Sequence, residues 1–485
     1  MQIRAIGIIA GLLIFVSMVQ AEETSFVPPN TPNGACIADY FTAFNGGEEA
    51  MKAFFLKCFS EQSLKTRSMD ERLNIYREMR QQLEQLRPER LVEADSVSAT
   101  VLASAGPDTW LAYTFRFDSL PPYKMLAIRI EESDPSLLNQ PQTPMSEQEF
   151  LDSLGNRLET MARQDEFSGV VIIARDNVPV FQKAYGAADK TFDVPNRLDT
   201  KFNLGSINKL FTRIAIGQLI QQGKVKFDDT LGQFLPQYPD DVARSRVTVA
   251  HLVSMSGGIG DFFGENFDNT PKDRFRANND FLPMFDSLPL AFEPGTKREY
   301  SNGGYVLLGT IVEKASGRNY YDYVRQNIFE PAGMTSTDSY EADIPTPNLA
   351  EGYTRSEGDK TARWRSNMYT RPARGSSAGG GYSTAEDLLR FVAALQNHKL
   401  LTPAFTQWIL TDARPDASKP MAAGEPTPVT QGIIGVAGGA PGINAVLEVD
   451  FSTGYAIVVM GNYDPPNAMR VAQMVRTWLK RVTKT

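Results

Sequence analysis

Residues 202–212 read Phe-Asn-Leu-Gly-Ser-Ile-Asn-Lys-Leu-Phe-Thr and place a serine and a lysine three positions apart, at Ser206 and Lys209. The apolar periodicity that follows predicts a helix continuing to Gly223. Residues three apart on a helix share one face. Ser206 would then lie at a helix N-terminus, where free N–H groups and the helix dipole favour negative charge. A lysine held out of water beside it can lose its proton near neutral pH and activate the hydroxyl.

The spacing alone is weak evidence, because Ser-x-x-Lys arises by chance in long chains and also fits a surface serine and lysine. The histidine content narrows the possibilities. Only two histidines, His251 and His398, occur in 485 residues. A zinc centre built from several histidines is therefore not expected, and no metal or cofactor is predicted. A Ser-His-Asp triad would have to use one of these two residues.

The overall composition is that of a globular protein, with 42% hydrophobic and 22% charged residues. A chain of this length favours two domains. The net charge of -8 and the pI near 5.2 argue against a nucleic-acid partner, which usually requires a basic face. The expected partner is a small-molecule substrate.

The first 21 residues read as a secretory signal peptide. Arg4 supplies a positive charge, Ile6 to Val19 form an apolar run too short for a comfortable membrane span, and a small residue at Ala21 fits a cleavage site. We expect a mature chain starting near Glu22 in the periplasm or outside the cell, without a membrane anchor. An uncleaved N-terminal anchor is the alternative.

The chain contains two cysteines, Cys36 and Cys58. In an oxidising compartment they can pair as a disulfide. Two buried thiols on neighbouring helices are an equally good interpretation, and the sequence leaves both open.

Residues 33–131 show helical periodicity followed by strand-like alternation, which predicts a small α+β domain. The expected helices are 35–44, 48–59 and 70–86, and the expected strands are 91–94, 97–103, 110–117 and 124–130. The order of elements resembles the cone fold of nuclear transport factor 2. No convergent set of titratable residues is found here, so an accessory role in docking or stability is favoured over a second active site. Residues 132–144, rich in Pro, Ser, Asn and Gln, are predicted to be a linker.

Residues 145–485 form the second predicted domain, with strands at both ends and helices between them. A helix at 145–164 precedes a hairpin at 167–186. Near the C-terminus, strands at 445–449 and 455–460 precede a helix at 468–481. We therefore expect an α+β domain whose antiparallel sheet is formed from both ends, with helices flanking it and a helical region inserted in the middle.

Four motifs follow one another in this domain. They are Ser206-x-x-Lys209, Tyr300-Ser301-Asn302 before an apolar helix, the glycine-rich run Gly375 to Thr384, and the second glycine-rich run Gly435 to Gly442. The order and the residues of these motifs resemble those of the serine β-lactamase and penicillin-binding-protein superfamily. The resemblance is to the branch that contains class C β-lactamases, D-Ala-D-Ala carboxypeptidases and related esterases. The resemblance extends from about Phe150 to the C-terminus.

The resemblance implies an acyl-enzyme mechanism without a cofactor. Ser206 would attack the carbonyl, Lys209 and Tyr300 would share the general-base role, and Asn302 would bind Lys209 or the acyl group. Because a phenol has an ordinary pKa near 10, a Tyr300 phenolate would need the positive charge of Lys209. The backbone N–H groups of Ser206 and Gly439 would form the oxyanion hole. The expected substrate-binding residues are Val436, Gly438, Ser377 and Gly379.

Two positions depart from the family pattern. Val436 stands where the family carries Lys or His, and Met255 stands in a run where the family often has His. A valine cannot bind a substrate carboxylate, but it suits a neutral ester or amide. Hydrolysis of an ester is therefore favoured over β-lactamase or D-Ala-D-Ala carboxypeptidase activity. The non-enzymatic alternative is a catalytically impaired binding or regulatory protein with the same fold.

A competing nucleophile is offered by Gly375-Ser376-Ser377-Ala378-Gly379, which matches Gly-x-Ser-x-Gly. That motif requires a strand before the serine and a helix directly after it. Residues 369–374 contain a proline and make a poor strand, two more glycines follow, and the downstream His398 lies in a polar turn. The run is better interpreted as a loop lining the Ser206 site, and His251 as a packed or helix-capping residue.

Overall fold

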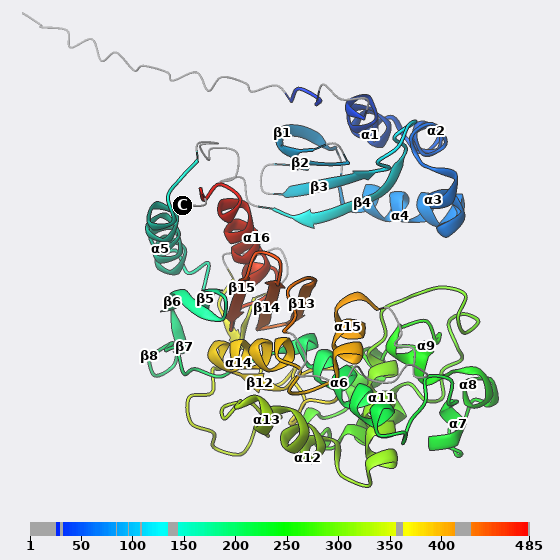
Figure 1. Ribbon diagram of the computed structural model, residues 1–485, viewed down its shortest axis with the longest axis vertical. Helices are drawn as coiled ribbons and strands as arrows, with labels where there is room; N and C mark the ends of the chain where they lie inside the picture. Colours follow the sequence, from blue (N-terminus) through cyan, green and yellow to red (C-terminus); the bar gives the residue numbers. More distant parts are fainter. Residues whose placement is uncertain are drawn as a thin grey trace, which may run out of the picture. The chain divides into compact units, whose positions relative to one another are not determined.

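The computed structural model describes residues 26–29, 33–83, 85–95, 97–106, 109–133, 144–355, 362–412 and 428–483. The chain divides into two compact units after Pro141 (Figure 1). The predicted signal peptide and most of the predicted linker lie outside the described residues. Within those ranges, no helix is both long and apolar enough to cross a membrane.

In its described residues, the first unit combines four helices with a four-stranded antiparallel sheet in the order β1-β2-β3-β4. The elements are α1 (Gly34–Gly46), α2 (Glu48–Cys58), α3 (Glu61–Thr66), α4 (Met69–Gln82), β1 (Arg87–Ala94), β2 (Ser98–Ser104), β3 (Trp110–Phe117) and β4 (Met125–Glu132). The sequence missed α3, because six residues are too few to show helical periodicity. The likeness to nuclear transport factor 2 stays a prediction.

The core of this unit is aromatic. Tyr40 of α1 packs against Phe54 of α2 and against Tyr113 and Phe115 of β3, with ring centroids 5.3–5.5 Å apart. Such edge-on and tilted ring pairs add to the free energy of apolar burial. Aromatic rings thus fill the space between the helices and the sheet.

A disulfide between Cys36 and Cys58 joins α1 to α2, and this settles the alternative that the sequence left open. Asp39 lies beside the two sulfur atoms, but both cysteines are bonded to each other and are not free to bind a metal ion.

The sheet of the second unit is antiparallel, in the order β13-β14-β15-β5-β6. Its strands are β5 (Gly169–Arg175), β6 (Val178–Tyr185), β13 (Ile433–Ala440), β14 (Ile443–Asp450) and β15 (Tyr455–Gly461). Strands from both ends of the domain are therefore neighbours, as β15 pairs with β5. The predicted fold class, α+β with a sheet built from both ends, is confirmed.

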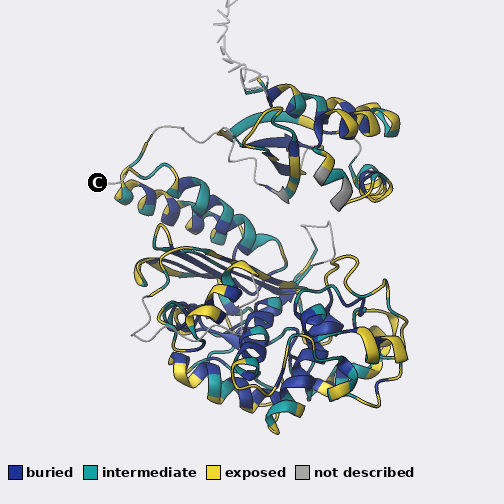
Figure 2. Cartoon of the chain, turned by 45° about the vertical axis from the view of Figure 1, so that its right-hand side comes forward, coloured by how far each residue is buried: buried dark blue, intermediate teal, exposed yellow. Residues whose placement is uncertain are grey.

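Both faces of this sheet are covered, as the buried strands in Figure 2 show. On β5, Val171 and Ile173 pack with α5 (Glu147–Arg163) and α16 (Asn467–Leu479), whereas Val170 and Ile172 pack into the main core on the opposite face. This alternation follows from the two-residue period of a strand. The run of apolar residues in β5 thus reflects burial on two sides.

Most of the helices that the structure describes lie in the inserted region. They are α6 (Asn208–Gln221), α7 (Leu231–Phe234), α8 (Asp241–Arg246), α9 (Val249–Val253), α10 (Glu265–Asn269), α11 (Asn302–Ser316), α12 (Tyr320–Val324), α13 (Glu330–Ala332), α14 (Ala385–Gln396) and α15 (Pro403–Thr411), with short strands β7 (Ala187–Asp189), β8 (Val194–Pro195), β9 (Phe202–Asn203), β10 (Tyr353–Thr354), β11 (Arg365–Ser366) and β12 (Tyr382–Ser383). Helix α6 is buried on nearly all sides and packs against α11. Pairing of β9 with β12 brings the first glycine-rich run to the Ser206 turn.

Candidate active site

Ser206 lies in a short 3-10 turn, Gly205–Ile207, directly before α6, and Lys209 lies in the first turn of α6. Gly205 adopts a φ of 48°, which favours glycine. A Cβ atom at this position would come within 2.9 Å of the backbone nitrogen of Gly439 on β13. Asn203 Oδ1 accepts a hydrogen bond of 2.9 Å from the Gly205 N–H. The turn is therefore fixed by its own backbone, by Asn203 and by the adjacent strand.

The side chains predicted to be catalytic converge on the Ser206 hydroxyl. Ser206 Oγ lies 2.6 Å from Tyr300 Oη and 3.2 Å from Lys209 Nζ. Lys209 also donates to Asn302 Oδ1 at 2.6 Å and to the backbone carbonyl of Ala378 at 2.5 Å. Tyr300 comes from the segment before α11, and Asn302 is the first residue of that helix. Three segments distant in sequence thus meet at the Ser206–Lys209 pair.

Burial sets the protonation of this group of residues. Lys209 is only 6% exposed, and desolvation of its ammonium group lowers its pKa to about 7, although the charge of Asp261 opposes the shift. Desolvation of the Tyr300 phenol raises its pKa. These directions favour Lys209 over Tyr300 as the base near neutral pH, and the predicted share of Tyr300 in the base role stays a prediction, because Tyr300 is itself 54% exposed.

Asp261 is a member of this network that the sequence analysis missed. Its Oδ2 accepts a hydrogen bond of 2.6 Å from Asn302 Nδ2. Asp261 follows the run Gly257 to Gly260 in the loop between α9 and α10. An aspartate after glycines is a common loop feature, so no motif distinguished it.

Strand β13 passes directly beside the Ser206 turn. A Cβ atom on Gly438 would come within 1.9 Å of the Leu204 carbonyl oxygen and 2.7 Å of the Ser206 nitrogen, so only glycine permits this approach. Gly439 is exposed on the opposite face of the strand, with its backbone nitrogen near Gly205. Val436 is partly buried and packs against the main core.

The first glycine-rich run borders the turn, but one of its predicted substrate contacts is wrong. A Cβ atom on Gly379 would come within 3.7 Å of the Ser206 nitrogen, so Gly379 adjoins the site. Ser377 is 0% exposed, and its Oγ lies 2.6 Å from Asn278 Oδ1 and 2.8 Å from the Tyr305 carbonyl oxygen. The Ser377 side chain is a core hydrogen-bonding group that substrate does not reach.

Because Ser377 is buried, it cannot serve as the competing nucleophile of the Gly-x-Ser-x-Gly motif. Neither histidine partners Ser377. His398 Nδ1 lies 3.0 Å from Thr406 Oγ1. His251 caps α9 through reciprocal hydrogen bonds with Thr248, which confirms the predicted capping role.

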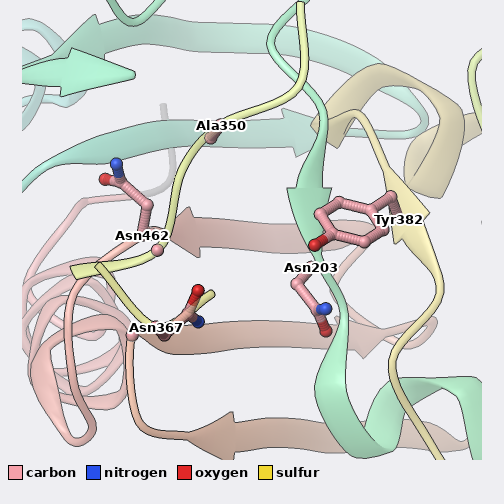
Figure 3. A pocket seen from close by; sticks show the side chains of 8 residues that line it. Asn203, Ala350, Asn367, Tyr382 and Asn462 are labelled. Carbon is pink, nitrogen blue, oxygen red and sulfur yellow. The ribbon is translucent and has the colours of Figure 1, made fainter. Parts of the chain in front are cut away.

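A small polar cavity lies beside the turn (Figure 3). Its lining residues are Asn203, Ala350, Gly352, Asn367, Tyr382, Gly442, Gly461 and Asn462. The space suits about one water molecule. The cavity does not include Ser206, but Asn203 links its wall to the turn through the bond to Gly205.

Comparison with known proteins identifies the family. The family model described as "Beta-lactamase" matches residues 156–479, which is more than half of the chain. The chain belongs to the β-lactamase family. The match begins well after the first unit and includes the turn, α11, the first glycine-rich run and β13.

Several relatives of this β-lactamase family member are informative. Penicillin-binding protein 4* of Bacillus subtilis is 33% identical over 197 residues, 40% of this chain and 43% of that protein. Esterase EstB of Burkholderia gladioli is 28% identical over 273 residues, 50% of this chain and 68% of that protein. The chain spans about half the length of the first curated relatives it matches.

Solved structures with the same fold include a penicillin-binding protein from Bacillus halodurans, with a TM-score of 0.56 and 29% identity over 65% of this chain and 97% of that one. A D-amino acid amidase from Ochrobactrum anthropi has a TM-score of 0.56 and 23% identity, over 69% of this chain and 98% of that one. The second likeness concerns the fold alone.

Proposed function

We propose that this β-lactamase family member is a serine hydrolase that forms an acyl-enzyme on Ser206. The observation that carries the proposal is the environment of Lys209 Nζ. Two of its neighbours, Asn302 Oδ1 and the Ala378 carbonyl, can only accept hydrogen bonds. The third neighbour, Ser206 Oγ, can also donate. A neutral lysine that donates to the first two therefore directs its lone pair at the serine proton.

The reaction follows from this arrangement. Lys209 takes the Ser206 proton as Oγ bonds to the substrate carbonyl carbon, and the neutral Tyr300 hydroxyl donates a hydrogen bond to Oγ. The N–H groups of Ser206 and Gly439 would stabilise the oxyanion. Collapse breaks the bond to the leaving group, which receives the proton from Lys209 through Tyr300. Water then attacks the acyl carbon and gives a proton to Lys209. Collapse breaks the bond between this carbon and Ser206 Oγ, Oγ takes the proton back from Lys209, and the carboxylic acid product leaves.

An uncharged ester is the substrate class that the site suits best. Val436 stands at the sequence position where the family carries Lys or His, so this position supplies no cation for a substrate carboxylate, and its side chain packs partly against the main core. Large apolar side chains are also exposed close to the network. Phe263, two residues after Asp261, is 54% exposed, and Leu288, which lies near Gly260, is 46% exposed. EstB is named as an esterase. D-Ala-D-Ala carboxypeptidase or β-lactamase activity is the second candidate, because other relatives are named penicillin-binding proteins.

We also propose export to the periplasm or beyond. The charged and apolar pattern of residues 1–21 supports a cleaved signal peptide. The disulfide between Cys36 and Cys58 agrees with an oxidising compartment. The first unit, with its aromatic core, would serve as an accessory domain resembling nuclear transport factor 2.

Labelling with a fluorophosphonate tests the nucleophile. We expect wild type to be labelled at Ser206 and Ser206→Ala to be unlabelled, with the exposed Ser245→Ala as the matched control. Turnover of p-nitrophenyl butyrate, nitrocefin and a D-Ala-D-Ala peptide then ranks the substrates, and the ester should be hydrolysed fastest. Absence of both labelling and ester turnover in wild type would contradict the enzyme proposal and favour a binding protein. Faster hydrolysis of nitrocefin or the peptide would contradict the ester preference.

A further inference from the structure

The carboxylate of Asp261 occupies the end of a hydrogen-bonded chain that leads to the nucleophile. Asp261 Oδ2 accepts from Asn302 Nδ2 at 2.6 Å, Asn302 Oδ1 accepts from Lys209 Nζ at 2.6 Å, and Lys209 reaches Ser206. The second carboxylate oxygen, Oδ1, accepts from the Phe263 N–H at 3.0 Å. Both oxygens are thus engaged, and neither touches a reacting atom.

We propose that Asp261 is a positioning residue that fixes the side-chain amide of Asn302 and thereby determines which proton Lys209 can accept. The inference rests on the proposed serine hydrolase function and adds a residue to its machinery. A carboxylate only accepts hydrogen bonds, so it holds the NH2 group of Asn302 toward itself. The amide oxygen must then face Lys209. With this orientation, two hydrogens of the neutral amine point at Asn302 and Ala378, and its lone pair points at Ser206.

The loop that carries Asp261 is held rigidly against the start of α11. Ser301 Oγ donates to the Gly260 carbonyl at 3.1 Å, and a Cβ atom on Gly303 would come within 2.4 Å of the same oxygen. Phe262 is 6% exposed and packs on Phe281 with ring centroids 4.9 Å apart. Asp261 therefore lies between a hydrogen-bonded backbone carbonyl and a buried aromatic side chain, as expected for a group that orients another side chain.

Asp261 also sets the charge around Lys209. Among the residues that the structure describes, the ionisable groups facing Lys209 are Asp261 and the rings of Tyr300 and Tyr305, whose centroids lie 4.8 Å and 5.6 Å from Nζ. The adjoining stretch of β13 carries only Val, Ala and Gly, and Ala378 contributes only a carbonyl. The charges of Arg213, Arg298 and Asp412 act on the Tyr305 phenol. The negative charge of Asp261 keeps the pKa of Lys209 from falling further.

The test is the pH dependence of Ser206 phosphonylation in Asp261→Asn. This substitution removes the charge and lets the Asn302 amide adopt either orientation. We expect the plateau rate to fall roughly tenfold and the acid limb, set by Lys209, to move down by about one pH unit. Asp268→Asn, which removes an exposed carboxylate from α10, should leave the profile unchanged. A lower plateau with the acid limb at the wild-type pH would show a merely structural role and overturn the inference.

Two further measurements test the role of Asp261 even if the Asp261→Asn variant does not fold or the wild-type protein shows no activity. Asn302→Ala breaks the chain at its next link, so it should move the acid limb in the same direction if Asp261→Asn does not fold. The NMR titration of the Lys209 Cε signal, assigned by its loss in Lys209→Met, reports the lysine directly. It should move to lower pH in Asp261→Asn even if wild type is never labelled. An unchanged titration would overturn the role of Asp261, whereas an unlabelled wild type would overturn only the proposed function.

Discussion

Each unit buries a cation, and the two cations illustrate different uses of the same burial. Among the described residues, the buried cationic side chains are Arg72 of α4, at 9% exposure, and Lys209 of α6, at 6%. Arg72 donates to the Ser63 and Arg67 carbonyls and lies 4.5 Å from the Phe59 ring centroid. Burial lowers the pKa of both residues, but a guanidinium keeps its proton whereas a lysine can lose it.

The difference shows what decides whether a buried charge is structural or chemical. Arg72 has several acceptors and a ring face, so its charge links α4 to neighbouring backbone. Lys209 has two obligate acceptors and one hydroxyl, so loss of one proton leaves a base directed at Ser206. Both cations are buried, so burial does not distinguish them. The residue type and the number of surrounding acceptors determine whether a buried cation holds the structure together or can act as a general base.

The largest expected effect is the loss of activity in Lys209→Met. The rate of ester hydrolysis should fall by about 10²–10⁴, because no base remains beside Ser206. Lys209→Arg should lose as much, since arginine keeps its charge but cannot accept the proton. Retained activity in either variant, measured as kcat/KM for p-nitrophenyl butyrate, would contradict the assignment of the base.

Lys209→Met should also stabilise the fold, by an amount that depends on pH. The folded pKa of Lys209, about 7, lies below the ordinary value of 10.5, so the cost of burying its charge is fully present below pH 7. That cost disappears as the pH rises from 7 toward 10.5. Urea unfolding should therefore show Lys209→Met more stable than wild type at pH 6 and similar to it at pH 10. An equal difference at both pH values would contradict the lowered pKa.

The disulfide gives the next largest effect, and it should be confined to the first unit. Replacing Cys36 and Cys58 by alanine releases a loop with a sequence separation of 22. The cost is about 3 kcal/mol of unfolding free energy. Thermal unfolding should show an earlier transition while ester hydrolysis by the second unit is retained. Loss of hydrolysis would show that the second unit depends on the first.

Arg72→Met is the structural counterpart of Lys209→Met. It should cost about 1–3 kcal/mol, because the Ser63 and Arg67 carbonyls lose a charged donor. Activity should stay at the wild-type level. A stability gain in calorimetry would break the comparison, since both buried cations would then be net destabilising.

The smallest expected effect concerns substrate choice at β13. Val436→His restores a side chain that can carry positive charge, and it should raise the ratio of peptide to ester hydrolysis by about tenfold. Stability should fall, because Val436 packs against the main core and a polar side chain is costly there. An unchanged ratio in a folded variant would show that Val436 does not face the bound substrate.

Local chemistry explains how much the sequence could predict. The apolar runs in the hairpin at 167–186 and in the strands at 445–449 and 455–460 predicted a sheet built from both ends of the domain. Helical spacing brought Ser206 and Lys209 together. Ser377 was misassigned, because a glycine-rich run indicates a loop at the site but not which of its side chains point into the core. Asp261 was missed for the related reason that its partner, Asn302, is 41 residues away and only folding brings the two together.

The sequence by itself determined the α+β fold, the order of the motifs and the pairing of Ser206 with Lys209, because periodicity and helical spacing act over a few residues. The tertiary structure alone decided that Lys209 is desolvated, that Ala378 and Asn302 take two of its hydrogens, and that Val436 packs against the core. Desolvation and hydrogen-bond direction depend on every segment that surrounds an atom. The motif therefore indicated the proposed nucleophile and its proposed base, and the fold supplied the environment that would make that base effective.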